Sequence, residues 1–292
     1  MKSVDVSIAI CTKNPDNKLL KVIEAIKGQE LLHVTVELII VDNGSDNAAS
    51  HRILSNVLKT WKDIRIIEEP TPGLAFARRR ACIASLGSYI LFVDDDNILN
   101  SDYVNSGYLY MQRNPAVGVL GGQSTCRLRN KFTAVSEAEW NMLAVCKQSS
   151  SGVASNGYVW GAGMVVRKEA FSRILSQGDP ICIGRTNDFI ETGDDGELCL
   201  MIAMLGYEIH VNNALVLEHQ IESKRLDSDN LRALRREYKW QINFRILLFM
   251  FSLLRLHNIK WKYCVYLIMR PAIAGKILLR FRRLVKLGYD KY

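Results

Sequence analysis

The chain has 292 residues, of which 48% are hydrophobic and 23% are charged, a composition typical of a folded globular protein and not of a disordered or fibrous one. Its seven cysteines are odd in number and form no CxxC pair, which argues against a zinc knuckle or a disulfide framework and favours reduced thiols. The first residues turn polar after a handful of apolar ones and do not resemble a secretory signal, so we expect a cytoplasmic protein.

The first hundred residues alternate between two kinds of segment. Short runs rich in β-branched residues predict strands, and longer runs with apolar residues three and four positions apart predict helices. The strands are expected at 6–10, 36–41, 64–67 and 89–93, and the helices at 17–29, 47–61 and 74–87. This alternation predicts right-handed βαβ units in an α/β fold, with a Rossmann-like, mostly parallel sheet flanked by helices.

The pattern loosens after residue 97. We expect a helix over 101–113, a strand over 117–122 and a polar helix near 136–148. A strand that turns into a helix follows over 161–171, and a helix followed by a strand over 193–209.

The net charge of +8 is distributed unevenly. Residues 231–292 hold fifteen Lys and Arg against two acids, a net charge of +13, which leaves −5 for residues 1–230. The basic segment is also apolar and aromatic, but its longest uncharged apolar run, 246–254, is too short to span a bilayer.

This contrast predicts two parts, a domain over 1–230 and a basic amphipathic helical tail over 231–292. Trp, Tyr and Phe interleaved with Arg and Lys suit helices that lie in a membrane interface among anionic headgroups. We therefore expect a peripheral protein on the inner face of the cytoplasmic membrane, with helices that pack on the first domain as the alternative. No nucleic-acid recognition motif is present, so nucleic acid is not an expected partner.

Three polar clusters follow predicted strands. "CTKN" begins at Cys11, "DNGSDN" at Asp42 and "DDDN" at Asp94. Because ligands of such sheets bind at the carboxyl ends of the strands, we expect these clusters to meet at one edge. Three adjacent carboxylates repel one another and raise each other's pKa unless a cation lies among them.

The chain lacks the glycine-rich turns that hold phosphates on backbone N–H groups. Neither GxGxxG nor GxxxxGK[ST] follows the first strand. A pyrophosphate at this edge therefore needs another positive partner, and a hard divalent cation held by one or two carboxylates provides one. The expected cofactor is Mg²⁺ or Mn²⁺, and its expected role is to hold a nucleotide diphosphate.

Five segments in order resemble the motifs of family 2 glycosyltransferases with the GT-A fold. They are "VSIAICTKN", "IIVDNGSDN", "PGLAFARRRA", "FVDDDN" and "TGDDGEL", and the resemblance extends over residues 6–225. It implies a nucleotide-sugar donor, a metal-bridged diphosphate, and transfer with inversion at the anomeric carbon.

The resemblance assigns residues to the nucleotide. Thr12 and Asn14 would line its pocket, Asp42 would accept a hydrogen bond from the base, as suits uracil, and Arg78 would lie near the nucleotide. Which arginine of 78–80 faces inward is left open.

The run of aspartates matches the DxD pattern of the family. Asp96 is the expected metal ligand, and Asp94 is expected near the ribose and the metal. Asn97 stands where the family often has a further acid. Asp95 is expected to point elsewhere, because successive residues that leave a strand face opposite sides.

"TGDDGEL" resembles the acidic motif that opens a helix in the family, with Asp194 in place of Glu. Asp195 would then be the general base that takes the proton from the acceptor hydroxyl. An acid favoured only by the helix dipole is the alternative for Asp195.

The remaining assignments concern the acceptor and the diphosphate. "WGAGMVVR" resembles the acceptor-side segment and begins at Trp160, and Gly161 and Gly163 would let the backbone approach a sugar closely. His219 and Arg225 would support diphosphate or metal binding, with a purely structural histidine as the alternative for His219.

The sequence as a whole indicates a metal-dependent inverting glycosyltransferase. It would move a hexosyl or N-acetylhexosaminyl group from a UDP-linked donor, with GDP or dTDP as alternatives, to a saccharide acceptor. The tail suggests that this acceptor is lipid-linked, as in the synthesis of surface polysaccharide. Two other hypotheses are a nucleotidyltransferase, for which the glycine-rich basic signature is absent, and a non-catalytic membrane scaffold that retains the fold.

Overall fold

The computed structural model describes residues 3–32, 34–132, 134–180, 182–184 and 193–235. Its first part alternates strands and helices as predicted. The elements are β1 (Val6–Thr12), α1 (Lys18–Lys27), β2 (Val36–Asp42), α2 (Ala48–Thr60), β3 (Ile64–Glu68), α3 (Leu74–Ala84) and β4 (Tyr89–Val93). Each predicted strand and helix of this part is confirmed, with ends that move by up to three residues.

The second part is less regular, with strands of 2 to 12 residues and longer connections. It comprises β5 (Asn97–Leu99), α4 (Tyr103–Arg113), β6 (Val117–Thr125), α5 (Glu137–Met142), β7 (Gly152–Val153), β8 (Met164–Arg167), α6 (Lys168–Leu175), α7 (Asp194–Met204), β9 (Glu208–His219) and the 3₁₀ helix η1 (Ser223–Leu226).

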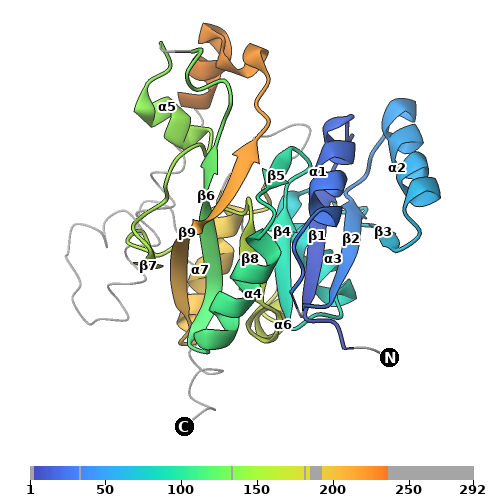
Figure 1. The fold of residues 1–292 in the computed structure, drawn as a ribbon, viewed down its shortest axis with the longest axis vertical. Coiled ribbons are helices and arrows are strands. Elements are labelled where there is room, and N and C mark those ends of the chain that lie inside the picture. Colours follow the sequence, from blue (N-terminus) through green and yellow to red (C-terminus); the bar gives the residue numbers. More distant parts are fainter. Residues whose placement is uncertain (1–2, 33, 133, 181, 185–192, 236–292) are drawn as a thin grey trace.

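One sheet joins the two parts (Figure 1). Its strand order is β3-β2-β1-β4-β8-β6-β9-β5, and β7 pairs with β9. The strands β3, β2, β1 and β4 are mutually parallel, β8 is antiparallel to them, and β6 and β9 return to the first direction. The predicted α/β fold with a mostly parallel sheet is therefore confirmed. The chain passes from β3 to β4 on the other side of β1, so the gap between β1 and β4 is a topological switch point.

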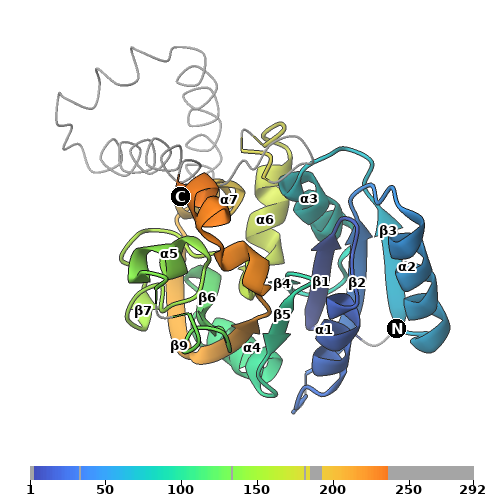
Figure 2. The ribbon, with the colours of Figure 1, turned by 90° about the horizontal axis from the view of Figure 1, so that it is seen from above.

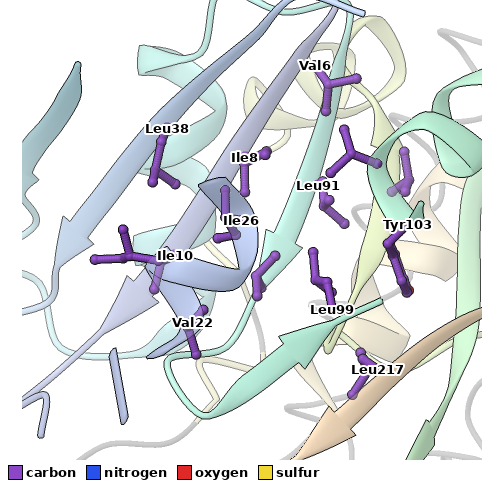
Figure 3. Close-up of a cluster of buried hydrophobic side chains, with 14 of the residues drawn as sticks. Val6, Ile8, Ile10, Val22, Ile26, Leu38, Leu91, Leu99, Tyr103 and Leu217 are labelled. Atoms are coloured by element: carbon purple, nitrogen blue, oxygen red, sulfur yellow. The ribbon is translucent and has the colours of Figure 1, made fainter. Parts of the chain in front are cut away.

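Helices cover both faces of the sheet because the strands are apolar on both sides. On β1, Ile8 and Ile10 face the cluster that contains α1, α2 and α4, and Ala9 faces the cluster with α3, α6 and α7. Figure 2 shows these helices as two layers with the sheet between them. Figure 3 shows the first cluster, in which Val22 and Ile26 of α1 lie over β1.

A third, smaller cluster lies away from these two layers. It combines apolar residues of the 126–145 segment with residues that follow β9, and its buried members are Cys126, Val135, Trp140, Leu143, Val145, Ile221, Leu226 and Leu231. Residues 228–235 are helical, and Leu234 packs against the same cluster. The first residues of the predicted tail thus contact the domain.

The predicted helix over 136–148 is wrong in length, because α5 ends at Met142. Ala144 then adopts a positive φ of 55°, which a helix cannot continue. The chain turns back onto β6, where the Ser124 N–H donates to the Cys146 carbonyl at 3.2 Å and Gln123 forms a bridge with Lys147. Pairing with the end of β6 therefore replaces the last helical turns.

Within the described ranges, no helix is both long and apolar enough to cross a membrane. Residues 236–292 lie outside these ranges, so the basic amphipathic tail and its contact with a membrane stay predictions.

Candidate active site

A cavity of about 560 Å³ opens at the carboxyl ends of β1 and β4, at the switch point of the sheet. This volume lies within the range typical of small-molecule sites. The cavity draws its walls from both parts of the fold. Its lining includes ten of the predicted site residues: Thr12, Arg78, Asp94, Asp96, Trp160, Gly161, Asp194, Asp195, His219 and Arg225.

The three aspartates after β4 form a turn between β4 and β5, and all three line the cavity. The buried Asn97, where the resemblance expected a further acid, donates from its side-chain amide to Asp94 Oδ2 at 3.0 Å. Asn97 therefore helps to orient the Asp94 carboxylate and does not itself supply a further acid.

The expectation that Asp95 points away from the site is wrong. Its carboxylate accepts a hydrogen bond from the hydroxyl of the buried Thr12 and lines the same cavity as Asp94 and Asp96. The alternation of side chains holds only in extended strands, and the chain has already begun a turn at Asp95. Burial raises the pKa of Asp95 to about 7, the Thr12 hydrogen bond opposes this rise, and the charges of Asp96 and Asp94 add to it.

Asp96 faces a group of cations. His219 Nε2 lies 3.2 Å from Asp96 Oδ2, and Arg225 Nη1 lies 3.9 Å from the same oxygen. Burial alone would raise the pKa of Asp96, but the His219 hydrogen bond and the charges of Arg225 and Lys18 outweigh it and lower the pKa below its usual value. The carboxylate is therefore ionised at neutral pH.

The other ring nitrogen of His219 fixes the orientation of the imidazole. Nδ1 lies 3.1 Å from the Leu143 carbonyl oxygen, and because a carbonyl can only accept, Nδ1 carries the hydrogen. In the protonated ring Nε2 donates to Asp96, and in the neutral ring the Nε2 lone pair points toward a position that a cation can share with Asp96.

Arg78 is the arginine of 78–80 that faces inward. Only 5% of Arg78 is exposed, and its guanidinium pairs with Asp194 and lies over the Phe92 ring. Arg79 and Arg80 donate to backbone carbonyls instead, Arg79 to Leu175 and Gly178 and Arg80 to Glu68. Arg78 thus links α3 with α7 across the cavity.

Asp195 lies in the first turn of α7. Its Oδ2 accepts from the Gly161 N–H at 3.1 Å, and its Oδ1 accepts from the Gly196 N–H at 2.7 Å. Burial raises the pKa of Asp195, the charge of Asp194 raises it further, and Arg78 and the two N–H groups oppose the rise. A carboxylate with a raised pKa and an accessible cavity in front of it is suited to accept a proton.

The two glycines of "WGAG" have different surroundings. Gly161 lines the cavity, so its predicted close approach to a sugar stays a prediction. A Cβ on Gly161 would clash with the Arg78 guanidinium, so this glycine also makes room for the arginine and for the hydrogen bond to Asp195. Gly163 does not line the cavity, which corrects its predicted place at the acceptor, because its Cα faces the Tyr103 hydroxyl and Leu217. Trp160 does line the cavity, and its backbone N–H donates to Gln148 Oε1 at 2.7 Å.

Two residues predicted for the nucleotide lie beside the cavity and not in its lining. The Asn14 side chain exchanges two hydrogen bonds with Asp46, which corrects its predicted place in the pocket wall. The Asp42 carboxylate accepts from the N–H and hydroxyl of Ser45, at 2.9 and 2.6 Å. Both side chains thus form hydrogen bonds with residues of the loop that follows β2. The hydrogen bond from a nucleotide base to Asp42 stays a prediction.

One wall of the cavity was missed by the sequence analysis. It consists of the end of α5 and the residues that follow, and includes Asn141, Met142, Leu143, Ala144, Cys146, Lys147 and Gln148. The capping box formed by Ser136 and Glu139 is the local signal for helix α5. Because α5 is far from the other motifs in the sequence, this signal does not predict that the helix lies at the cavity.

Solved structures identify the fold. The S. aureus TarS fragment 1–349 in complex with UDP-GlcNAc aligns with a TM-score of 0.55 and 14% identity, over 84% of this chain and 67% of that one. GalNAc-T7 with UDP, GalNAc and Mn²⁺ aligns with a TM-score of 0.57 and 11% identity, over 76% of this chain and 44% of that one. At such identities the likeness shows the fold alone, which is the predicted GT-A fold.

The family follows from the sequence match. Residues 7–175, more than half of the chain, match Glycosyl transferase family 2, and the chain belongs to this family. An N-acetylglucosaminyltransferase of Azorhizobium caulinodans is 23% identical over 209 residues, which are 70% of this chain and 51% of that protein. An uncharacterized glycosyltransferase of Haemophilus influenzae is 31% identical over 94 residues, 32% of this chain and 37% of that protein. The chain thus spans about half or less of the length of these relatives.

The residues around the aspartate turn fit a divalent cation. No group of three or more His, Cys, Asp or Glu side chains in the described ranges is arranged to hold a metal by itself. Mg²⁺, however, is usually bound in proteins by one or two carboxylates together with phosphate oxygens and waters, and Asp94 and Asp96 line one cavity. His219 adds a nitrogen donor whose other nitrogen is held by a carbonyl, an arrangement typical of metal-binding histidines.

Proposed function

We propose that the protein is a metal-dependent inverting glycosyltransferase that uses a nucleotide-diphosphate sugar, UDP-linked in the first instance, and a saccharide acceptor. The observation that carries this proposal is the convergence of Asp94, Asp96 and Asp195 on one cavity at the switch point of the sheet. Membership of the family supports the class of reaction. The neighbours crystallised with UDP and UDP-GlcNAc support the kind of donor.

In the proposed reaction, Asp195 accepts the proton of an acceptor hydroxyl as that oxygen attacks the anomeric carbon of the donor. A carbon–oxygen bond forms to the acceptor while the bond from the anomeric carbon to the diphosphate breaks, so a single displacement inverts the configuration. A positioned general base contributes about 10²–10⁴-fold. The hydrogen bonds from Gly161 and Gly196 hold the carboxylate of Asp195 in place for this step.

Mg²⁺ or Mn²⁺, when bound, would stabilise the charge that develops on the leaving diphosphate. Asp96 and Asp94 would hold the ion, with His219 beside them, and Arg225 adds a further positive charge on the same side of the cavity. Arg78 neutralises Asp194, so that fewer uncompensated carboxylates face an anionic donor.

We further propose that the acceptor is lipid-linked, that the protein acts in surface polysaccharide synthesis, and that residues 236–292 bring it to the inner face of the cytoplasmic membrane. The support is the net charge of +13 over 231–292 and its mixture of aromatic and basic residues. The full chain should sediment with phosphatidylglycerol vesicles and not with phosphatidylcholine vesicles, and added salt should weaken this binding. Equal binding to both kinds of vesicle would contradict the proposal.

The donor assignment is tested by the unfolding of the full chain with nucleoside diphosphates, with and without Mn²⁺. UDP at a hundred times its Kd should stabilise the protein by about 2.7 kcal/mol, and only with Mn²⁺ should this effect be complete. GDP and dTDP at the same concentration should stabilise it less. Asp96→Asn should remove the dependence on Mn²⁺, and if no nucleoside diphosphate stabilises the wild-type protein the proposed function is wrong. A screen of nucleotide sugars for hydrolysis or transfer would then identify the sugar.

A further inference from the structure

The wall of the cavity formed by residues 141–148 has two supports. Cys146 and Lys147 pair with the end of β6. The start of the wall stands on the third hydrophobic cluster, in which Trp140 and Leu143 pack with Leu226 and Leu231. Three of the eight buried members of this cluster come from residues that follow β9 (Figure 1).

Glu139 is the polar centre of this junction. Its side chain is 4% exposed and accepts hydrogen bonds from the Ser136 N–H at 2.8 Å, from the Ser136 hydroxyl at 2.6 Å and from Arg235 Nε at 3.0 Å. The Ser136 hydroxyl, Arg235 and the Ser136 N–H together lower the pKa of Glu139 to about 2, so the group is charged at any working pH. Among the described residues Arg235 is the cation that pairs with Glu139, and the arginine side chain is itself 57% exposed.

The backbone of α5 connects Glu139 to the cavity. The Glu139 carbonyl accepts from the Leu143 N–H at 2.9 Å, and the Leu143 carbonyl in turn accepts from His219, whose other nitrogen faces Asp96. Leu143 itself lines the cavity together with Asn141. A shift of α5 would thus move both the wall and the imidazole beside the aspartate turn.

Arg235 reaches Glu139 from the start of the basic segment, residues 231–292. The chain leaves β9 at His219, places Arg225 in the cavity from η1, and continues as the helical residues 228–235 to Arg235. One continuous stretch of chain therefore supplies two groups to the cavity and the cation that holds Glu139.

We propose that Glu139 is a positioning residue for the cavity: by holding Arg235, it fixes the wall of residues 141–148 and, through Leu143, the imidazole of His219. The role of the cavity in transfer rests on the proposed function. A displacement of the wall reaches the imidazole beside Asp96, whereas Thr12 and Asn43 are held by the ends of β1 and β2.

The chain offers a matched set of variants. Glu139→Gln removes the charge but keeps an acceptor for Ser136, because Gln also completes a capping box. Arg235→Gln removes the other partner, and Arg235→Lys keeps the charge. Asp229→Asn is the control: it loses an ion pair with Arg232 on the helical residues 228–235, and its side chain is 81% exposed.

Hydrogen exchange of the full chain is the first measurement. Amides of residues 141–148 should exchange about tenfold faster in Glu139→Gln and in Arg235→Gln, the loss expected for one charged hydrogen bond. The double variant should exchange no faster than the faster single variant, because both remove the same interaction. Arg235→Lys should retain part of the protection, and Asp229→Asn should match the wild type. Unchanged exchange in Glu139→Gln would overturn the proposal.

Kinetics then separate positioning from general destabilisation. With octyl glycosides as acceptor probes and UDP-GlcNAc as donor probe, Glu139→Gln should lower kcat/KM for transfer about tenfold, while the Kd for UDP measured without a divalent cation stays within about twofold of the wild type. Equal losses in cation-free UDP binding and in transfer would mean a merely structural role. If the wild type fails to bind UDP while the exchange result holds, the proposed function falls and the link from Glu139 to the wall stands.

Discussion

The two sides of the cavity are built in different ways. On one side, β1, β2 and β4 hold their end residues through continuous parallel pairing, so that Thr12 and Asp42 are paired in register. On the other side, residues 141–148 and 220–235 come from distant segments and are held by a small apolar cluster, a few side-chain hydrogen bonds and a short pairing of Cys146 and Lys147 with β6. The first side is the one that family motifs mark.

This difference has a physical consequence. A strand inside a sheet opens only with the sheet, whereas a wall supported by a separate small cluster can open locally at lower free energy. The side assigned to the nucleotide is therefore expected to be rigid, and the opposite side is expected to admit changes in shape and in acceptor preference. The following predictions test that division, beginning with the largest effect.

Asp195→Asn should lower the rate of transfer about 10²–10⁴-fold, because the amide cannot accept the proton of the acceptor hydroxyl. The Kd for UDP should change little, since the substitution is isosteric and Asp195 lies where α7 meets Gly161. Steady-state kinetics and calorimetry measure the two quantities. Asp229→Asn, which alters an 81% exposed carboxylate, is the control. Full activity in Asp195→Asn would contradict the assignment of the base.

Arg78→Met should destabilise the protein by about 3–5 kcal/mol, because it leaves Asp194, whose side chain is 9% exposed, without the Arg78 cation. Urea unfolding measures the loss as a lower midpoint at an unchanged slope. Arg79→Met on the same helix removes only hydrogen bonds to backbone carbonyls and should cost about 1 kcal/mol. Equal losses in the free energy of unfolding for the two variants would show that the Arg78–Asp194 pair adds no more stability than the hydrogen bonds of Arg79.

Trp140→Ala should destabilise the third cluster by about 3–5 kcal/mol, since the side chain is 2% exposed and fills its centre. Exchange of amides in the 126–148 segment should rise, while those of β1 and β4 keep their protection. Phe171→Ala, in the cluster over the main sheet, should cost a similar amount but lower the midpoint of global unfolding. A uniform response to both substitutions would remove the distinction between the two sides.

The pH dependence of transfer should show an acidic limb set by Asp195. Burial and the neighbouring Asp194 raise its pKa to about 6, and the base works only when ionised, so activity is lost as the pH falls through this value. Below the limb, kcat/KM should fall about tenfold per pH unit. Asp194→Asn removes one cause of the raised pKa and should move the limb to lower pH. If the acidic limb of the pH profile does not move in Asp194→Asn, another group than Asp195 sets it.

Much of the fold could be predicted from local pattern. The strands β1 to β4 and helices α1 to α3 are confirmed because each carries a regular apolar period and is bounded by polar or glycine residues. The helix expected over 136–148 is half its predicted length, because Cys146 and Lys147 pair with β6 instead. A contact between distant segments determines where α5 ends, and local sequence preferences do not predict such a contact.

The site shows the same division. Asp94, Asp96 and Asp195 line the predicted cavity because each follows or begins a regular element whose end faces the switch point. Asp95 was misplaced because strand alternation was extended into a turn, and Asn14 because its partner Asp46 lies on another loop. Side-chain direction outside regular elements depends on such partners.

The sequence by itself determined the α/β architecture, the edge of the sheet that holds the site, and the family, since these follow from period, order and charge along the chain. Only the tertiary structure decided that Arg78 faces inward, that His219 lies between Leu143 and Asp96, and that Glu139 holds Arg235. These contacts join residues far apart along the chain, and their geometry exists only once the apolar clusters have brought the segments together.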